Sequence, residues 1–194
     1  MTNTNKQLVP VAYSREVKVD STIKYMGQVI TVLTKGIETN GRLAFMEVKV
    51  RPGLEPPPHI HEREHELFFV LEGAIRFYTP EKTFDVYAGG VGFLPEGKPH
   101  TFTCLTEEIR ALIIVGATGD ETVGMDGFLL AMGIPARDMI VPDATITSQV
   151  DDPDQAIEVG ASWGIRFLTP EDTKKALPQY SRLRGSYPLT EAIG

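Results

Sequence analysis

The chain has 194 residues, of which 42% are hydrophobic and 23% charged, and its formal net charge is −7. This length and composition are typical of one soluble globular domain with a sizeable core. The acidic balance excludes nucleic-acid binding, which needs a basic surface, and the absence of an apolar run of about 18 residues excludes a membrane span. A single cysteine excludes an intrachain disulfide. Together with an N-terminus that has no apolar signal-peptide core, it predicts a cytoplasmic protein.

The first fifty residues predict an arm followed by short strands. Residues 1–22 are polar, and we expect them to pack as an arm across the body of the domain or across a neighbouring subunit. The stretch 23–34 is rich in β-branched residues and predicts one or two strands. Residues 43–50 then alternate between apolar and polar side chains, which indicates a half-buried strand with Met46 and Val48 on its inner face.

Chemistry-bearing residues gather between positions 53 and 73, where the sequence reads GLEPPPHIHEREHELFFVLEG. His59 and His61 are two residues apart, so a β-strand projects both imidazoles to the same side. Glu66 follows, and the apolar run after it predicts a buried strand. Two imidazoles and a carboxylate that converge on one point are what a transition-metal site requires.

The next forty residues continue the strand pattern. Residues 74–79 and 84–87 flank a turn and predict a hairpin. In the stretch 89–104, His100, Phe102 and Cys104 occupy alternate positions, so we expect them to share one face. Residues 109–115 predict the last clear strand. Short strands separated by glycine and proline turns, with no helix between them, predict an all-β sandwich or closed barrel.

The last third of the chain predicts helices. Residues 126–132 suit a short helix, and Asp-Pro at 152–153 and Thr-Pro at 169–170 are start signals for helices that end near 160 and 177. Two interpretations remain open for these helices. In the favoured one they pack on the exterior of the domain. In the other they form a lid over the mouth of a pocket, with apolar contacts from Phe128, Leu129 and Met132.

Two sequence blocks resemble the motifs of the cupin superfamily, G-x5-H-x-H-x3–4-E-x6-G and G-x5-P-x-G-x2-H-x3-N. The first is matched by Gly53, His59, His61, Glu66 and Gly73, and the second by Gly89, Pro95, Gly97 and His100. Cys104 stands where the second motif ends in asparagine, a position that is not a metal ligand in that family.

The resemblance implies a fold and an assembly. It implies a single cupin domain over residues 1–194, a double-stranded jelly-roll barrel at about 23–117 with a helical extension at about 124–194. The metal ligands it implies are His59, His61, Glu66 and His100. Cupins often pair their barrels, so a homodimer is expected.

Three imidazoles and one carboxylate suit a divalent transition metal, either Fe, Mn, Ni, Co, Cu or Zn, and leave coordination positions open. Glu66 has two candidate roles, as a ligand and as a general base that takes a proton from a bound substrate. An apolar and aromatic interior would favour a planar or aromatic substrate. The residues expected to line this substrate pocket are Met46, Val48, Phe68, Phe77, Phe93 and Phe102.

Within the superfamily the chain looks most like quercetinase-type dioxygenases, through the two motifs and a tail at 163–170. That resemblance implies a dioxygenase that uses a metal and O2 on a small enolisable or aromatic, flavonol-like molecule. Two alternatives remain: a metal-dependent isomerase, cyclase or lyase that needs no O2, and a non-catalytic cupin that binds a metal and a small molecule.

Residues beside the two motifs receive milder interpretations. His65 should point away from the ligands, and the charged turn Glu62–Arg63–Glu64 should be solvated. Cys104 suits a small buried hydrophobe better than a reactive thiol. Tyr25 and Gln28 would bring polar groups near the mouth of the pocket, although the sequence does not fix their direction.

Overall fold

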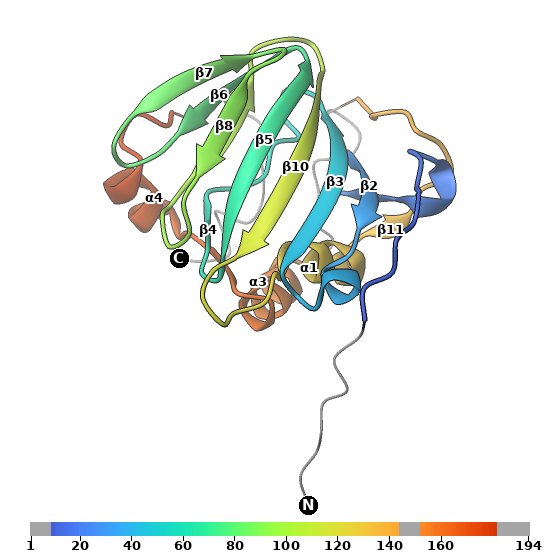
Figure 1. Ribbon diagram of the computed structural model, residues 1–194. Helices are drawn as coiled ribbons and strands as arrows, with labels where there is room; N and C mark the ends of the chain where they lie inside the picture. Colours follow the sequence, from blue (N-terminus) through green and yellow to red (C-terminus); the bar gives the residue numbers. More distant parts are fainter. Residues whose placement is uncertain (1–8, 144–151, 182–194) are drawn as a thin grey trace, which may run out of the picture.

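A computed structural model describes residues 9–143 and 152–181 as a barrel of antiparallel strands with short helices at one end (Figure 1). The larger sheet has seven strands in the order β11-β1-β2-β3-β10-β5-β8. Their bounds are β1 Thr22–Tyr25, β2 Gln28–Thr34, β3 Leu43–Val50, β5 Glu64–Glu72, β8 Val91–Leu94, β10 Ile109–Ala117 and β11 Ile134–Pro135. The all-β prediction is confirmed.

Two smaller sheets complete the barrel. One has the order β7-β6-β9, and the other pairs β12 with β4. Their bounds are β4 His59–His61, β6 Ala74–Tyr78, β7 Thr83–Tyr87, β9 Thr101–Cys104 and β12 Ile165–Phe167. The predicted hairpin of β6 and β7 is therefore present, with Ala74 opposite Tyr87.

Turn chemistry explains why residues 22–34 form two strands rather than one. Met26 and Gly27 have φ angles of 51° and 78°, and two consecutive positive φ values define the tight hairpin turn that matches the twist of the strands. Tyr25 and Gln28 close this hairpin as a directly opposed pair.

The two sheets meet through a cluster of three aromatic rings. Phe68 on β5 lies 5.1 Å from Phe77 on β6 and 5.5 Å from Phe102 on β9, measured between ring centroids. Each ring is at most 4% exposed. Edge-on contacts of this kind add to the free energy gained by burying the rings, so the cluster joins the larger sheet to the β7-β6-β9 sheet.

Three helices lie in the described part of the C-terminal third: α1 Met125–Met132, α3 Pro153–Ser162 and α4 Pro170–Ala176. The Asp152 side chain accepts a hydrogen bond from the Gln155 N–H, and the Thr169 hydroxyl accepts one from the Asp172 N–H. The two predicted start signals are thus confirmed. None of the helices within the described ranges is long and apolar enough to cross a membrane.

The tail also supplies a strand that the sequence did not indicate. β12 pairs antiparallel with β4, placing Ile165 opposite His61 and Phe167 opposite His59. The C-terminal extension therefore holds the strand that carries two of the candidate ligands.

The predicted arm, residues 1–22, is described only from residue 9. It lies along one end of β2 and the short 3₁₀ helix Gly36–Thr39, where the Arg15 guanidinium pairs with Glu38 at 2.8 Å and the Tyr13 hydroxyl donates to Thr34. A second 3₁₀ helix, Val19–Ser21, leads into β1. Residues 1–8, 144–151 and 182–194, which belong to the predicted arm and helical extension, lie outside the described residues.

Candidate metal centre

The four residues named from the two motifs lie together inside the barrel. One ligand atom from each of His59, His61, Glu66 and His100 lies within 4.8 Å of every other, and each residue is at most 7% exposed. β4 presents the two histidines on one side, as the alternation of a strand requires. His100 is brought to them by an isolated β-bridge, in which the backbone N–H groups of His59 and His100 donate to each other's carbonyl at 3.0 and 2.9 Å.

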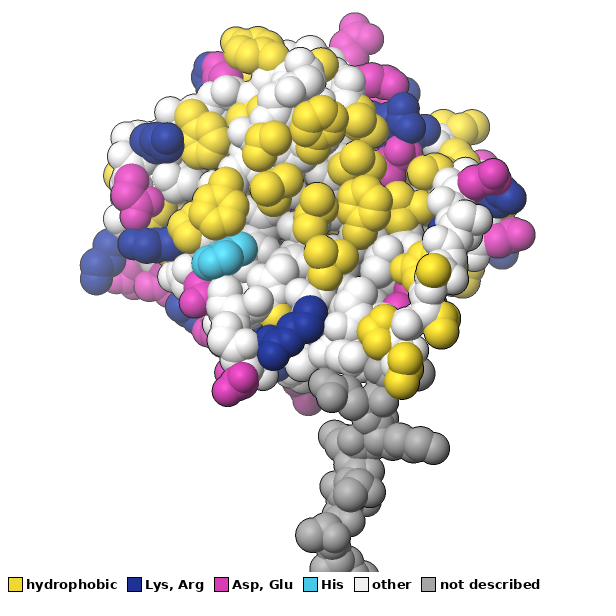
Figure 2. Space-filling view, viewed as in Figure 1, with side chains coloured by type: hydrophobic (Ala, Val, Ile, Leu, Met, Phe, Trp, Pro, Cys, Tyr) yellow, Lys and Arg dark blue, Asp and Glu magenta, His cyan; other side chains and the backbone are white. Residues whose placement is uncertain are grey.

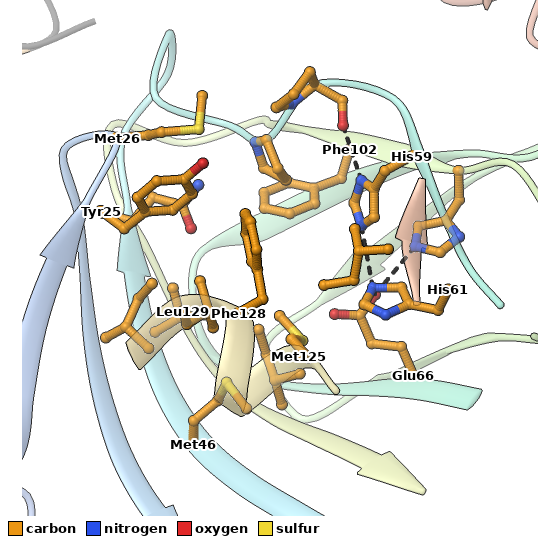
Figure 3. A pocket seen from close by; sticks show the side chains of 18 of the residues that line it. Tyr25, Met26, Met46, His59, His61, Glu66, Phe102, Met125, Phe128 and Leu129 are labelled. Carbon is orange, nitrogen blue, oxygen red and sulfur yellow. Dashed lines mark hydrogen bonds and ion pairs between the residues drawn. The ribbon is translucent and has the colours of Figure 1, made fainter. Parts of the chain in front are cut away.

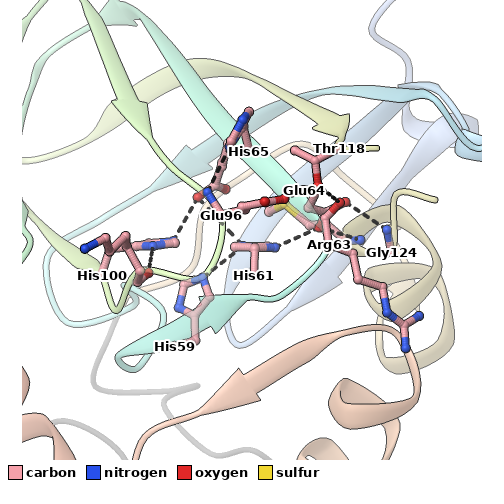
Figure 4. A network of polar contacts seen from close by, with 12 residues as sticks. His59, His61, Arg63, Glu64, His65, Glu96, His100, Thr118 and Gly124 are labelled. Atoms are coloured by element: carbon pink, nitrogen blue, oxygen red, sulfur yellow. Dashed lines mark hydrogen bonds and ion pairs between the residues drawn. The ribbon is translucent and has the colours of Figure 1, made fainter. Parts of the chain in front are cut away.

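Hydrogen bonds fix the orientation of all three rings (Figure 4). The Nδ1 atom of His59 lies 2.8 Å from the Pro57 carbonyl, and that of His100 lies 3.0 Å from the Lys98 carbonyl. The Nδ1 atom of His61 lies 2.7 Å from a Glu64 carboxylate oxygen. Carbonyls only accept, so Nδ1 of His59 and His100 carries the proton and donates, and Nε2 of each neutral ring is left with a free lone pair.

The Nε2 atoms and the Glu66 carboxylate face one another at short range. Nε2 of His59 is 3.2 Å from Nε2 of His61, and Nε2 of His100 is 3.2 Å from a Glu66 oxygen. His100 Nε2 is buried without a hydrogen bond to any residue the structure describes. Electron pairs that converge in this way repel each other unless a positive charge lies among them. The donor set therefore fits a divalent metal ion.

His59 and His61 differ in their tendency to take up a proton, and both tendencies suit a metal site. Burial, with His100 and His61 nearby, lowers the pKa of His59 well below its usual value. For His61, burial acts to lower the pKa, but the hydrogen bond to Glu64 and the charges of Glu66 and Glu64 outweigh it and raise the pKa. The carboxylates thus draw a cation towards His61, and a bound metal satisfies the same attraction.

Glu64 corrects the expectation of a solvated charged turn, because it is only 2% exposed. Its carboxylate accepts the Nδ1–H of His61 and also the backbone N–H groups of Gly124 at 2.8 Å and Met125 at 3.1 Å. Gly124 in turn lies against the Trp163 carbonyl, where a side chain has no room. One buried acid thus ties a candidate ligand to the start of α1.

His65 lies away from the metal centre, as strand alternation predicted. Its Nδ1 atom accepts the Glu96 backbone N–H at 2.9 Å, and its ring packs on Phe93 with centroids 5.2 Å apart. In Figure 4 it lies on the far side of β5 from His59 and His61.

A cavity of about 60 Å³ opens beside the metal centre (Figure 3). Of the predicted pocket residues, Met46, Val48, Phe68 and Phe102 line it. Phe77 does not line it, because it lies within the aromatic cluster at 0% exposure. Phe93 is on the wrong face: Gly92 and Leu94 are the buried positions of β8, and Phe93 is 51% exposed.

The rest of the cavity wall is formed by residues whose side chains the sequence patterns did not show to face the cavity. Of the three residues named for a lid, Phe128 and Leu129 on α1 line the cavity, whereas Met132 only packs against the core. α1 therefore forms part of the cavity wall. The remaining lining residues outside the prediction are Tyr25, Met26, Gln28, Ile30, Pro56, Pro57, Ile113, Met125, Ile165 and Phe167. Most of them reach the cavity through the β1–β2 hairpin or through the pairing of β12 with β4, which local sequence patterns do not reveal.

Comparisons with known proteins agree with this fold. Residues 46–116 match a family model described as a cupin domain, a little over a third of the chain. The match is a similarity over this stretch, and the predicted jelly-roll barrel with short C-terminal helices is confirmed. No curated protein sequence matches the chain.

Several solved structures are similar to about half of this chain at low identity. The cupin domain of Schizosaccharomyces pombe Cnp3 is 18% identical over 50% of this chain and 68% of its own, with a TM-score of 0.45. A predicted oxalate decarboxylase from Thermotoga maritima is 22% identical over 47% and 81%, with a TM-score of 0.43. KdgF from a Halomonas species is 19% identical over 48% and 83%, with a TM-score of 0.42.

Replacement of Glu64 by glutamine tests the anchoring of His61. We expect Glu64→Gln to weaken metal affinity by about 10- to 100-fold, because the charge that orients the ring and raises its basicity is lost while all four ligands remain. A chelator-competition titration measures the affinity. Glu62→Gln is the matched control, since Glu62 is exposed and pairs with Arg166 at 3.1 Å. Equal affinities of the two variants would contradict the proposed anchoring.

Cys104 is expected to be chemically inert. Its Sγ lies 3.8 Å from the Val50 carbonyl, and burial together with the nearby Glu55 carboxylate raises the pKa of the thiol far above its usual value. The thiolate, which is the reactive form, is therefore scarce at pH 8. Iodoacetamide should modify the folded protein at least roughly tenfold more slowly than the guanidinium-unfolded protein. Because this is the chain's single cysteine, intact-mass spectrometry reads the result directly, and equal rates would refute it.

Proposed function

We propose that this protein is a metal-dependent dioxygenase that acts on a small enolisable or aromatic, flavonol-like substrate. The observation that carries the proposal is the convergence of three imidazole Nε2 atoms and one carboxylate at the wall of an apolar cavity. Structural metal sites are closed and commonly rich in thiolates, whereas this donor set has none and opens on a cavity.

A divalent transition metal held by His59, His61, Glu66 and His100 would supply Lewis-acid and redox chemistry at this wall. The protein's own contribution begins with Glu66. Its carboxylate is 2% exposed and lines the cavity, where it is positioned to take the proton of an enol group. Removal of that proton makes the substrate electron-rich, which is the condition for a reaction with O2.

The cavity wall supports the substrate class. Aromatic and aliphatic side chains dominate it, and such a lining binds flat apolar molecules and excludes water. At ~10–15 Å³ of such volume per water molecule, the cavity holds about four to six waters, the bulk of one small ring. A single-ring enolisable molecule therefore fits as the barrel stands. A flavonol needs α1, which carries Phe128, to move outward.

The buried base favours a second candidate function. A carboxylate that removes the proton of an enolisable carbon is all that an isomerase, cyclase or lyase needs beside a Lewis acid, and O2 takes no part. The same cavity also suits a cupin that binds a metal and a small molecule without turnover. The experiment below separates these three functions.

The test compares the metal-loaded protein in air and under nitrogen, with a panel of one-ring enolisable compounds and 3-hydroxyflavone. We expect O2 uptake with product formation in air only. Glu66→Gln, supplied with excess metal so that the site stays loaded, should lower the rate by about 10²- to 10⁴-fold, the usual contribution of a general base. Glu62→Gln is the control, and elemental analysis verifies the loading.

Each alternative has its own outcome. Product formed at equal rates with and without air, and lost in Glu66→Gln, would replace the dioxygenase with the isomerase, cyclase or lyase. If a ligand binds the metal-loaded protein and is never converted, the remaining function is that of a non-catalytic binding protein.

We also propose that the protein forms a homodimer through the outer apolar face of the larger sheet (Figure 2). The outward positions of four neighbouring strands in an antiparallel sheet are usually polar when they face water. Here eight of them are apolar: Phe45, Leu67, Phe69, Leu71, Val91, Phe93, Leu112 and Ile114. At the margin of this face Arg110 is paired with Glu47 and Glu72, so its charge is already compensated there, and the charge of Lys49, directly opposite Arg110, stays at the rim of the interface.

A lysine at the centre of this face should separate the subunits. We expect Phe69→Lys to sediment as a monomer at micromolar concentration where the wild type sediments as a dimer, because the dimer would bury an unpaired charge. Tyr87→Lys is the matched control, since Tyr87 is 64% exposed on the smaller sheet. Circular dichroism confirms folding, and a wild type that sediments as a monomer would overturn the assignment.

A further inference from the structure

Tyr25 lies across the cavity from the metal centre. In Figure 3 its ring and Met26 occupy one side of the cavity, the labelled histidines and Glu66 occupy the other, and Phe128 lies between them. The ring stands edge-on to Phe128 with centroids 5.4 Å apart, and the residue is 9% exposed. The position of this tyrosine is fixed by the β1–β2 hairpin and by α1.

The hydroxyl group of Tyr25 is buried and makes no hydrogen bond to any residue within the described ranges. Buried polar groups in folded proteins are nearly always satisfied, because an unmet donor loses its hydration without compensation. Burial also raises the pKa of this phenol, so the group keeps its proton and remains a donor at neutral pH. An unsatisfied donor on the wall of a cavity is a feature that a ligand would complete.

A second polar side chain lies beside it. Gln28 is the direct partner of Tyr25 across the hairpin and also lines the cavity. Its amide nitrogen donates to the Leu54 carbonyl at 3.0 Å, which holds the side chain in place and fixes the amide orientation. These two residues form a second polar end of the cavity, opposite the metal centre.

We infer that the Tyr25 hydroxyl donates a hydrogen bond to a second oxygen of the ligand, at the end remote from the metal. This assignment rests on the proposed function, because it takes the other end of the ligand to be metal-bound. It narrows the substrate class to a flat ring with an enolisable oxygen at one end and a carbonyl or hydroxyl at the other. The second oxygen is neutral, because the described residues that line the cavity include no lysine or arginine to pair with a carboxylate.

Substituted tropolones test the inference without any turnover. Tropolone binds metals through its two adjacent oxygens, and its 5-position points directly away from them. 5-Hydroxytropolone and 5-methyltropolone therefore present either an oxygen or a methyl group of similar size to the far end of the cavity. Their dissociation constants are measured by absorbance titration of the full-length, zinc-loaded protein, because zinc holds the ligand and cannot activate O2.

The variant is Tyr25→Phe, and Tyr78→Phe is the control, since Tyr78 lies on β6 and is not a cavity residue. The ratio of the two dissociation constants in the wild type, divided by that ratio in the variant, cancels the intrinsic metal affinity of each tropolone. We expect the preference for the hydroxyl compound to fall by about five- to tenfold in Tyr25→Phe. In Tyr78→Phe the preference should match the wild type. An unchanged preference in Tyr25→Phe would overturn the inference, as would failure of both compounds to bind the loaded wild type.

A second measurement guards against a purely structural role. Because the hydroxyl lacks a partner, Tyr25→Phe should raise or preserve the unfolding midpoint of the ligand-free protein. A clearly lower midpoint would mean that the hydroxyl serves the fold, and the inference would fail. The proposed function fails separately: no O2 uptake with any substrate, alongside an intact tropolone preference, would reject the dioxygenase and leave the role of Tyr25 standing.

Discussion

The structure depends on hydrogen bonds that hold mutually repelling ligand atoms close together at the metal centre. Backbone carbonyls of Pro57 and Lys98 and the carboxylate of Glu64 hold the three imidazoles by their Nδ1 atoms, which turns the opposite nitrogens towards one small volume. Without a cation this arrangement is unfavourable, and the surrounding barrel keeps it from relaxing. The rest of the fold can be understood as the scaffold that maintains this geometry: the β-bridge from His59 to His100, the Phe68 cluster between the sheets, and the pairing of β4 with the tail.

The cavity joins that centre to a wall of different character. Near the histidines the chemistry is polar and charged, and the middle is aromatic, whereas the Tyr25 end is polar without charge. Such a gradient orients a ligand as well as binding it, since only one end of an asymmetric molecule suits the metal. Glu64 adds a link between the metal centre and the wall, because it holds both His61 and the first backbone groups of α1.

Sequence patterns predicted the features that depend on local spacing. His59 and His61 alternate with one residue between them, and the helix starts at Asp152 and Thr169 carry their own capping groups. The predictions that failed depended on which face of a strand points inward or on partners that are distant in the sequence. Phe93 was expected to line the pocket as part of an apolar and aromatic interior, but its neighbours Gly92 and Leu94 are the inward-facing residues of β8. Glu64 was expected in water because nothing in its own segment reveals the N-terminus of α1 above it.

The pairing of β12 with β4 has a consequence for the order in which the protein matures. The strand that presents two ligands finds its neighbour about a hundred positions later in the chain, at Ile165–Phe167. Among the strands that the structure describes, this one comes last in the chain. The histidine pair therefore gains this support only after residues 165–167 have been synthesised, which is after all the other described strands.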